Sequence, residues 1–369
     1  MSAQKVPPAC TDFTNSIPKS VEFAAKSLLR RSSSAGPCVK LTAEVLTVLP
    51  NYAFFKGRVV PYKDANVGIL THALNYGSAV FGGLRAYWSD EEQQLFIFRP
   101  QDHFKRFLQS AKLMCMELPY SADQLVDNLT ELMRKEGHQE DCYIRPLAFF
   151  SDEIIGVRLH NLHTEFSMIA LPFGRYGTNE DGQHVTVSSW RRVDDNILPA
   201  RGKIAGAYVN SAFVKTDANR AGFDEALVLN QDGHISEGSA ANVFMFRNGV
   251  WATPPITDNI LEGITRRSII QFMREDLKWE IVERSIDRTE VYLADEMFFA
   301  GTGVQVAAIT KVDHRNVGTG QMGEQTAQLK KLFLDVVHGR NAKYRNWCYP
   351  IYEKAPGGSG RRPDHVAVK

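Results

Sequence analysis

One lysine, Lys203, lies among small residues in a segment that could present its amine for covalent chemistry. The segment NILPARGKIAGAYVNS (residues 196–211) has a proline before the lysine and a helical pattern after it. Its glycines and alanines indicate that something flat approaches the backbone closely. A lysine kept from bulk water has a lowered pKa and can form a Schiff base with a carbonyl compound. The alternative is a solvated lysine in a turn, because lysine is seldom fully buried.

Two charged residues in other motifs could act together with this lysine. Glu237 lies in HISEGSAANVFMF (residues 234–246), among small residues at the edge of a predicted strand. Taken alone, it could be an ordinary surface acid. Arg145 lies inside the apolar strand YIRPL (residues 143–147). Burying an arginine there is costly unless it faces a cleft and binds a carboxylate.

Two glycine-containing turns could bind an anion. Gly263-Ile264-Thr265 directly precedes a helical pattern, so its amides should form a helix N-terminus with free N–H donors. A capping threonine is the simpler alternative. Gly301-Thr302-Gly303 leaves a strand in a turn that could aim its amides and hydroxyl at phosphate. A P-loop nucleotide-binding protein is excluded because the sequence has no Walker motif.

Together these motifs describe one chemistry. They supply a lysine for a Schiff base, an acid for a ring nitrogen, two phosphate-binding turns and an arginine for a substrate carboxylate. Pyridoxal 5′-phosphate requires these groups, and we therefore predict it as the cofactor. No metal site is predicted, because the five cysteines are scattered and form no CxxC pair.

The elements that must position these residues indicate an α+β fold in two domains. The segment LFIFRPQDHFKRFLQSAKLM (residues 95–114) is typical of a strand followed by a helix, and SADQLVDNLTELMRKEG (121–137) predicts a second helix with Ser121 as its N-cap. The glycine-rich, polar segment GRYGTNEDGQ (174–183) is the predicted interdomain linker, and strands predominate after it. The predicted parts are an extension over residues 1–45, a small domain over 46–173, the linker over 174–183, a larger cofactor-binding domain over 184–350 and a flexible tail over 351–369.

Composition and charge exclude several classes of protein. The net charge of +1 gives no support for a nucleic-acid or anionic-membrane partner, and no apolar run has the length of a transmembrane helix. The cysteine pattern favours a reducing compartment, so we predict a cytoplasmic location. Residues 1–45 are basic and serine-rich, which is typical of either a loosely ordered extension or a transit peptide. A transit peptide would instead direct the protein to mitochondria or plastids.

The chain closely resembles the branched-chain amino acid aminotransferases, within the class IV (fold type IV) pyridoxal-phosphate enzymes. The resemblance covers residues 50–350. It is carried by THALNYGSAVFGGLRAY, HFKRFLQSAKLM, YIRPLAFF, SSWRRVDDNILPARGKIAGAYVNS, DEALVLNQDGHISEGSAANVF and LEGITR. It implies a D-amino acid aminotransferase-like fold, with a small N-terminal α/β domain and a larger mixed-sheet, pseudo-barrel domain. It also implies an active site between the domains that a neighbouring subunit completes, and hence at least a homodimer.

The resemblance implies a role for individual residues. Lys203 corresponds to the lysine that binds the cofactor and then transfers protons, and Glu237 to the acid that pairs with the pyridine nitrogen. Tyr208 corresponds to the tyrosine that hydrogen-bonds the cofactor's 3′ oxygen. The residues implied to bind the phosphate are Arg106, Ile264, Thr265 and Thr302. The residues implied to bind the substrate's α-carboxylate and side chain are Tyr76, Phe81, Tyr143, Arg145, Tyr176 and Gly303.

The implied reaction exchanges the amino group of L-leucine, L-isoleucine or L-valine with 2-oxoglutarate, giving branched-chain 2-oxo acids and L-glutamate by a ping-pong mechanism. The alternative is a class IV aminotransferase for another amino acid or amine in a specialised biosynthetic pathway. The YIRPL and THALNYG motifs argue against a D-amino acid enzyme or a lyase. A homologue without activity is disfavoured because Lys203, Glu237 and Arg106 are all present.

Four motifs depart from the family's usual pattern, and none of the changed residues belongs to the implied cofactor set. Phe-Glu-Gly is replaced by Phe81-Gly82-Gly83, which removes a carboxylate near the expected substrate pocket. The other departures are Ala240-Ala241 for Gly-Glu, Phe173-Gly174-Arg175-Tyr176 for a Trp-Gly-Ala-Tyr-like element, and Gly156-Val157-Arg158-Leu159 for Gly-Val-Asn-Pro. We interpret Arg158 and Arg175 as solvated rim residues, with recognition of a second carboxylate as the alternative.

Overall fold

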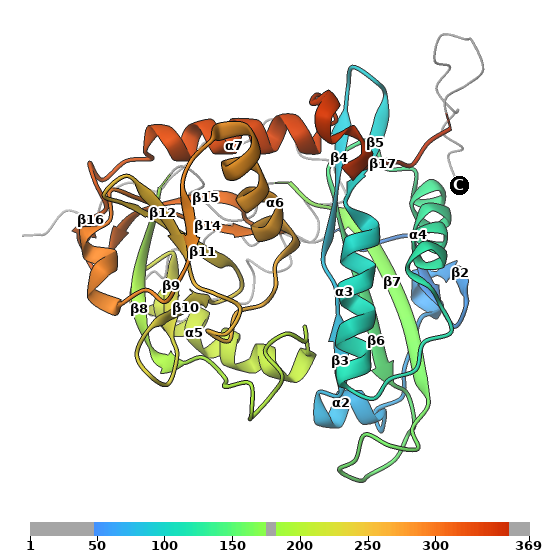
Figure 1. Ribbon diagram of the computed structural model, residues 1–369. Coiled ribbons are helices and arrows are strands. Elements are labelled where there is room, and N and C mark those ends of the chain that lie inside the picture. Colours follow the sequence, from blue (N-terminus) through green and yellow to red (C-terminus); the bar gives the residue numbers. More distant parts are fainter. Residues whose placement is uncertain (1–47, 175–181, 354–369) are drawn as a thin grey trace, which may run out of the picture. The chain divides into compact units, whose positions relative to one another are not determined.

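The computed structural model describes residues 48–174 and 182–353, which contain two β-sheets with flanking helices (Figure 1). The predicted extension (1–45), most of the predicted linker and most of the predicted tail lie outside the described residues. Residues from Val48 onward group into one compact unit. None of the helices described is long and apolar enough to cross a membrane.

The first sheet is antiparallel, with the strand order β17-β5-β4-β6-β7-β1-β2 and with β3 beside β6. Its strands are β1 (Tyr52–Phe55), β2 (Arg58–Pro61), β3 (Ala79–Phe81), β4 (Leu84–Ser89), β5 (Gln94–Phe98), β6 (Cys142–Phe150), β7 (Thr164–Pro172) and β17 (Cys348–Pro350). Helices α3 (Pro100–Leu113) and α4 (Ala122–Glu136) pack on it through one apolar core (Figure 1). The short helix α2 (His72–Tyr76) precedes β3.

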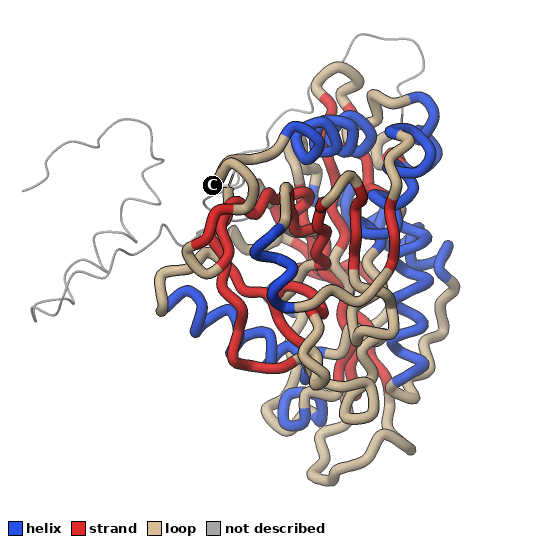
Figure 2. Tube along the Cα trace, turned by 60° about the vertical axis from the view of Figure 1, so that its left-hand side comes forward, coloured by secondary structure: helices blue, strands red, loops and turns tan. Residues whose placement is uncertain are grey.

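The second sheet is mixed, with the strand order β10-β9-β8-β15-β14-β11-β12-β13. Its strands are β8 (Gln183–Arg191), β9 (Glu225–Leu229), β10 (Ile235–Gly238), β11 (Asn242–Arg247), β12 (Val250–Thr253), β13 (Ile281–Glu283), β14 (Glu296–Gly301), β15 (Gln305–Val312) and β16 (Arg315–Asn316), which pairs with β15. Strand β8 is parallel to both β9 and β15. Figure 2 shows helices flanking the strands of both sheets, and those of the second sheet are α5 (Tyr208–Arg220), α6 (Ile264–Phe272) and α7 (Glu324–Val337).

Short helical segments complete the described structure. The 3-10 helices are Tyr62–Asp64, Ala205–Ala207, Arg288–Leu293 and Ala342–Trp347, and a π-helical turn over Met273–Leu277 continues α6. The predicted α+β class is therefore confirmed.

Local sequence signals explain two of the first sheet's connections. Lys56 and Gly57 both have positive φ, which is the backbone conformation of a tight hairpin turn between β1 and β2. Ser121 caps α4 through a capping box with Gln124, and Gly137 ends the helix in the left-handed conformation. The N-cap at Ser121 was predicted from the sequence and is confirmed.

The end of the described chain differs from the predicted boundary at residue 350. Strand β17 pairs with β5 of the first sheet, and the side chain of Ile351 is fully buried in that sheet's core. Residues 348–351 therefore belong to the first sheet and not to the larger domain or to a tail. The physical reason is the hydrophobic effect. Burial of the Ile351 side chain beside α4 removes its apolar surface from water, whereas a solvated tail would leave that surface exposed.

Candidate active site

A cavity of about 700 Å³ lies between the two sheets, and both contribute to its walls. It contains eleven of the predicted site residues: Phe81, Arg106, Tyr143, Arg145, Lys203, Tyr208, Glu237, Ile264, Thr265, Thr302 and Gly303. The structure thus brings together residues that lie in separate motifs of the sequence.

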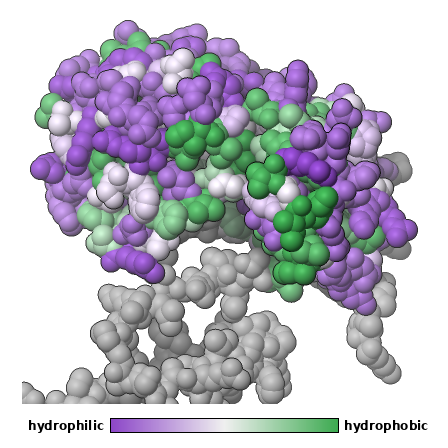
Figure 3. Space-filling model, turned by 90° about the horizontal axis from the view of Figure 1, so that it is seen from below, coloured by the Kyte–Doolittle hydropathy of each residue, from purple (hydrophilic) through white to green (hydrophobic). Residues whose placement is uncertain are grey.

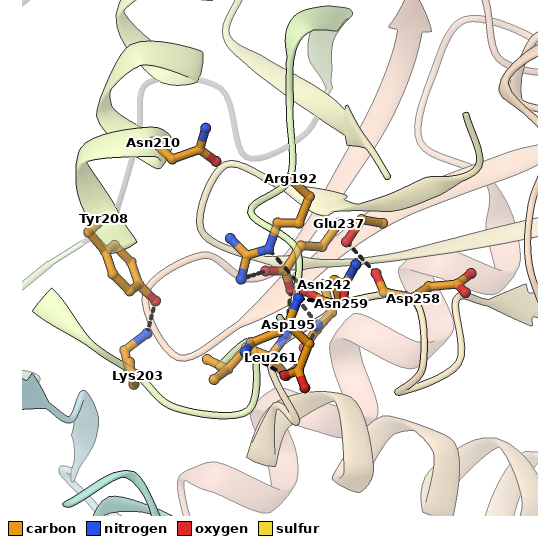
Figure 4. Close-up of polar contacts among 12 residues, drawn as sticks. Arg192, Asp195, Lys203, Tyr208, Asn210, Glu237, Asn242, Asp258, Asn259 and Leu261 are labelled. Carbon is orange, nitrogen blue, oxygen red and sulfur yellow. Dashed lines mark hydrogen bonds and ion pairs between the residues drawn. The ribbon is translucent and has the colours of Figure 1, made fainter. Parts of the chain in front are cut away.

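The backbone of Lys203 is held by elements of the first sheet. Its N–H donates to the Ser110 hydroxyl of α3 at 3.1 Å, and its carbonyl accepts from the Phe81 N–H at 3.0 Å. The amine Nζ donates to the Tyr208 hydroxyl oxygen at 2.5 Å (Figure 4). Desolvation inside the cavity, with the positive charge of Arg106 as the next cause, lowers the pKa of Lys203 well below its usual value. This shift favours the neutral form of the amine, which is its nucleophilic form.

The small residues after Lys203 allow a close approach of main chain. The Gly206 N–H donates to the Gly77 carbonyl at 3.2 Å, and a Cβ on Gly77 would lie 2.9 Å from the Gly206 Cα. Gly77 has φ of 64°, so a side chain there would also strain the backbone. The flat group that the sequence indicated at this point is thus the peptide that ends α2.

Glu237 lies at the opposite end of this constellation from Lys203 and is fixed by three donors (Figure 4). Its carboxylate forms an ion pair with Arg192 at 2.9 Å and accepts hydrogen bonds from the Asn242 amide at 2.9 Å and the Leu261 N–H at 3.1 Å. The side chain is only 5% exposed. Burial raises the pKa of Glu237, and the charge of Arg192 opposes that rise.

Sequence reasoning missed Arg192 and Asn242. Arg192 lies in the SSWRRVDD part of a recognised motif, but nothing in that motif shows that it reaches Glu237. Asn242 begins β11, and the pleat of that strand turns its amide toward Glu237.

The predicted anion-binding turns both face the cavity. Gly263 is the N-cap of α6 and has no side chain to occupy the first amides of the helix, so those N–H groups remain available to an anion. A Cβ at Gly263 would overlap with the Asn242 side chain that holds Glu237. Arg106 of α3 donates to the Glu262 carbonyl at 3.0 Å, beside this helix end. The second turn, Thr302-Gly303, joins β14 to β15.

Arg145 lies on the wall of the cavity that the first sheet forms, where it contacts two aromatic rings. Its Nη2 donates to the Tyr143 hydroxyl at 3.2 Å. Its guanidinium lies 4.7 Å from the centre of the Phe81 ring and 5.2 Å from that of Tyr143. Both contacts are within the range of cation–π attraction and leave the remaining N–H groups free to bind a carboxylate in a fork.

One predicted substrate residue does not line this cavity. Tyr76 is not among its lining residues; its hydroxyl accepts from the Gly156 N–H at 3.1 Å and its ring packs on His72. Helix α2 directs this side chain toward the loop after β6, so the role of Tyr76 in substrate binding stays a prediction. Tyr176 lies outside the described residues, as does Arg175.

Two departures from the family pattern lie away from the cavity. A Cβ at Gly82 would overlap with the Pro146 ring, and Gly82 is not among the residues that line the cavity. Arg158 is exposed and does not line the cavity, consistent with a solvated residue.

Gly83 provides the space for Tyr143, and this gives a prediction. A Cβ at Gly83 would overlap with the Tyr143 hydroxyl. Gly83→Ala is therefore expected to displace that ring and raise the KM for amino acids by about tenfold, as small misplacements of binding groups do. Steady-state kinetics measures the change. In a Tyr143→Phe background the added methyl group meets no hydroxyl, so Gly83→Ala should cost much less there; equal costs in both backgrounds would contradict the explanation.

This chain is similar in sequence to a known enzyme family. Residues 79–312 match the family model described as amino-transferase class IV. The chain is 43% identical over 304 residues to the probable branched-chain-amino-acid aminotransferase of Aquifex aeolicus, covering 82% of this chain and 98% of that protein.

Solved structures of similar sequence have the same fold. The branched-chain amino acid aminotransferase of Thermobaculum terrenum in its PLP form is 35% identical, with a TM-score of 0.79, and the match covers 82% of this chain and 99% of that one. The branched-chain aminotransferase of the archaeon Thermoproteus uzoniensis with norvaline is 39% identical, with a TM-score of 0.79, and the match covers 82% of this chain and all of that one.

A third solved structure carries an adduct of the cofactor. It is a branched-chain amino acid aminotransferase, its source abbreviated T.th., complexed with N-(5′-phosphopyridoxyl)-L-glutamate. Its sequence is 36% identical, its TM-score is 0.77, and the match covers 83% of this chain and all of that one.

Proposed function

The chain belongs to the class IV aminotransferases, and we propose that it transfers the amino group of L-leucine, L-isoleucine or L-valine to 2-oxoglutarate. Its activity is that of a branched-chain-amino-acid aminotransferase, and its cofactor is pyridoxal 5′-phosphate. The observation that carries the proposal is that Lys203 and the buried carboxylate of Glu237 line one cavity, with the two glycine-containing turns around them.

The chemistry of the donor set fits the cofactor. We propose that Arg106, the first amides of α6 at Ile264 and Thr265, and Thr302 hold its phosphate. Tyr208 is assigned to the 3′ oxygen and Glu237 to the ring nitrogen. When bound, pyridoxal phosphate supplies an electron sink for the carbanion at the substrate's Cα.

The protein's own groups position the substrate and move its proton. Lys203 Nζ is assigned as the base that takes the proton from Cα, because its lowered pKa favours the neutral amine, which can accept a proton. Tyr208 orients that amine through their hydrogen bond. The α-carboxylate is assigned to Tyr143 and the Thr302-Gly303 turn.

The cavity wall supports a branched aliphatic side chain. The apolar residues that line it are Phe81, Leu147, Ile169, Leu171, Phe173 and Val304. A wall of this kind excludes water from an aliphatic side chain and gains free energy from each buried methyl group. A substrate with a polar amine or a second charged group would lose hydrogen bonds to water over most of this surface.

The 2-oxoglutarate acceptor needs a cation for its second carboxylate, and we propose Arg145 for that role. The phosphopyridoxyl-glutamate adduct in the third related structure supports glutamate as a partner of such a cavity. The test is a panel of 2-oxo acid acceptors with L-leucine as donor. Turnover should be fastest with 2-oxoglutarate, and Arg145→Met should raise the KM for 2-oxoglutarate more than that for 3-methyl-2-oxobutanoate, the 2-oxo acid of valine. Equal effects on both would contradict this role of Arg145.

A homodimer is proposed as the working assembly. Apolar side chains are exposed around α2 and the loop after β6, among them Ile69, Leu74, Ile155 and Val157. Figure 3, seen from below Figure 1, shows hydrophobic surface at this end of the molecule. An exposed apolar group of this size is typical of a surface that a partner covers. Tyr76 lies in the same region, which supports its use by a second subunit.

A further inference from the structure

Arg85 lies in β4 and donates hydrogen bonds to three backbone carbonyls, which belong to two segments far apart in the sequence. Its Nη1 donates to the Gly303 carbonyl at 3.1 Å. Its Nη2 donates to the Phe173 carbonyl at 3.1 Å and to the Gly174 carbonyl at 2.5 Å. The first of these carbonyls belongs to the turn of the second sheet, and the other two to the end of the first sheet's strand β7. One guanidinium therefore ties both sheets together beside the cavity.

The position is costly for an arginine, which argues against a merely stabilising role. The side chain is 4% exposed, and the carboxylate of Asp141 lies 3.9 Å away. The Nε atom is buried and has no hydrogen-bond partner among the described residues. The Phe173 ring, 5.3 Å from the guanidinium, contributes only a weak cation–π attraction. A buried charge that is incompletely paired is poor evidence of stability and needs another explanation.

The explanation is that the hydrogen bond from Arg85 to the Gly303 carbonyl fixes the orientation of the Thr302-Gly303 turn. Thr302 and Gly303 line the cavity, and the proposed function assigns their turn to the substrate's α-carboxylate. The Gly303 carbonyl and the Val304 N–H belong to one planar peptide and rotate together, and the glycine that precedes this peptide bond lets it rotate easily. A cation that holds the Gly303 carbonyl therefore fixes the direction of the Val304 N–H and the orientation of the turn. The guanidinium geometry suits this task, since its planar fork reaches several acceptors at once.

We propose that Arg85 is a positioning residue that holds the Thr302-Gly303 turn in the orientation that binds the α-carboxylate. The inference rests on the proposed function, because it adds a determinant of carboxylate binding to the same site. Arg85 contacts neither the reacting atoms nor, by this proposal, the substrate. It acts through the turn, so its effect should be common to all amino acid substrates whatever their side chains.

The test compares Arg85→Lys with the wild-type holoenzyme. Lysine keeps the charge but cannot hold several carbonyls in a fixed fork. We expect the KM values for L-valine, L-leucine and L-glutamate to rise by a similar factor of roughly ten or more, with kcat changed by less than about threefold. The dissociation constant of 4-methylvaleric acid, measured by its effect on the holoenzyme's absorption, should rise by the same factor. Hydrogen exchange should become faster at residues 302–304.

Arg345→Lys is the matched control. Arg345 also bridges a carboxylate, Glu92, and a backbone carbonyl, that of Gly339, and it is not among the residues that line the cavity. Its replacement should lower the melting temperature without changing any KM. Asp141→Asn is a milder second variant, because Asp141 is 29% exposed and remains a hydrogen-bond acceptor. It should raise every KM by a smaller common factor.

Three outcomes would overturn the proposal. The first is an unchanged KM and 4-methylvaleric acid affinity in folded Arg85→Lys. The second is a KM that rises only for amino acids with large side chains. That result would assign the effect to displacement of Phe173, which lines the side-chain part of the cavity. The third outcome concerns Asp141→Asn and decides the matter if Arg85→Lys does not fold. An unchanged KM in the folded Asp141→Asn variant would then overturn the proposal. If the wild type binds 4-methylvaleric acid but transaminates none of these donors, the proposed function fails, and the acid's affinity for the two variants still decides the role of Arg85.

Discussion

Replacement of Lys203 with alanine should abolish transamination, lowering kcat by about 10⁴-fold or more, which is the upper range for loss of a positioned acid–base group. The amine lies 2.5 Å from the Tyr208 hydroxyl, and desolvation with the charge of Arg106 lowers its pKa. No other lysine lines the described cavity, so no described group can take over its role. The measurement is turnover of L-leucine with 2-oxoglutarate by the purified variant.

Lys343→Ala is the control for Lys203→Ala. Lys343 pairs with Asp276 at 2.8 Å and is not among the residues that line the cavity. Its loss should leave kcat within a factor of about two, as surface substitutions do. Turnover of Lys203→Ala within about tenfold of the wild type, in a preparation free of wild-type enzyme, would show that another group performs the proton transfer.

Replacement of Glu237 with glutamine should have the second-largest effect, a fall in kcat of about 10²- to 10³-fold, comparable to removal of a preorganised electrostatic group. Glutamine keeps the size of the side chain but loses the negative charge that we assign to the ring nitrogen. Arg192, at 2.9 Å, would then remain without its carboxylate partner. Glu290→Gln is the matched control, because that acid also pairs with an arginine, Arg284, but does not line the cavity.

The pH dependence provides an independent check on Glu237. Burial raises the pKa of this carboxylate, so the wild type should lose kcat as the pH falls and the carboxylate becomes protonated. Glu237→Gln has no proton to gain at this position, so its low kcat should lack that acidic limb. An acidic limb that is the same in both proteins would assign it to another group and would contradict the role of Glu237.

The residues of the cavity were predictable because their signals are local. A helix that begins at Ile264 after a glycine, and a turn after β14, place their free amides by backbone geometry alone. The resemblance then related Lys203, Glu237 and Arg106 to one cofactor, and the structure places all three in one cavity. Local motifs and a known family are together sufficient for this part of the site.

The contacts between distant segments were not predictable in this way. Arg85 and Gly303 are separated by 218 positions, and neither residue shows in the sequence that they meet. The same holds for Arg192 and Glu237, whose pairing depends on how the loop after β8 returns to β10. The position of Tyr76 was not predictable for a related reason, since its motif indicates a short helix but not the direction in which that helix faces.

The absorption spectrum of the holoenzyme, recorded before and after addition of L-leucine without any 2-oxo acid, tests the central claim most directly. The claim predicts that the visible band of the bound pyridoxal cofactor decreases while the near-ultraviolet band of its aminated form increases, and that 2-oxoglutarate reverses the change. A protein that binds pyridoxal phosphate but shows no spectral change with leucine, isoleucine or valine would contradict a branched-chain aminotransferase. A protein that remains colourless with added pyridoxal phosphate would contradict the assignment of the site itself.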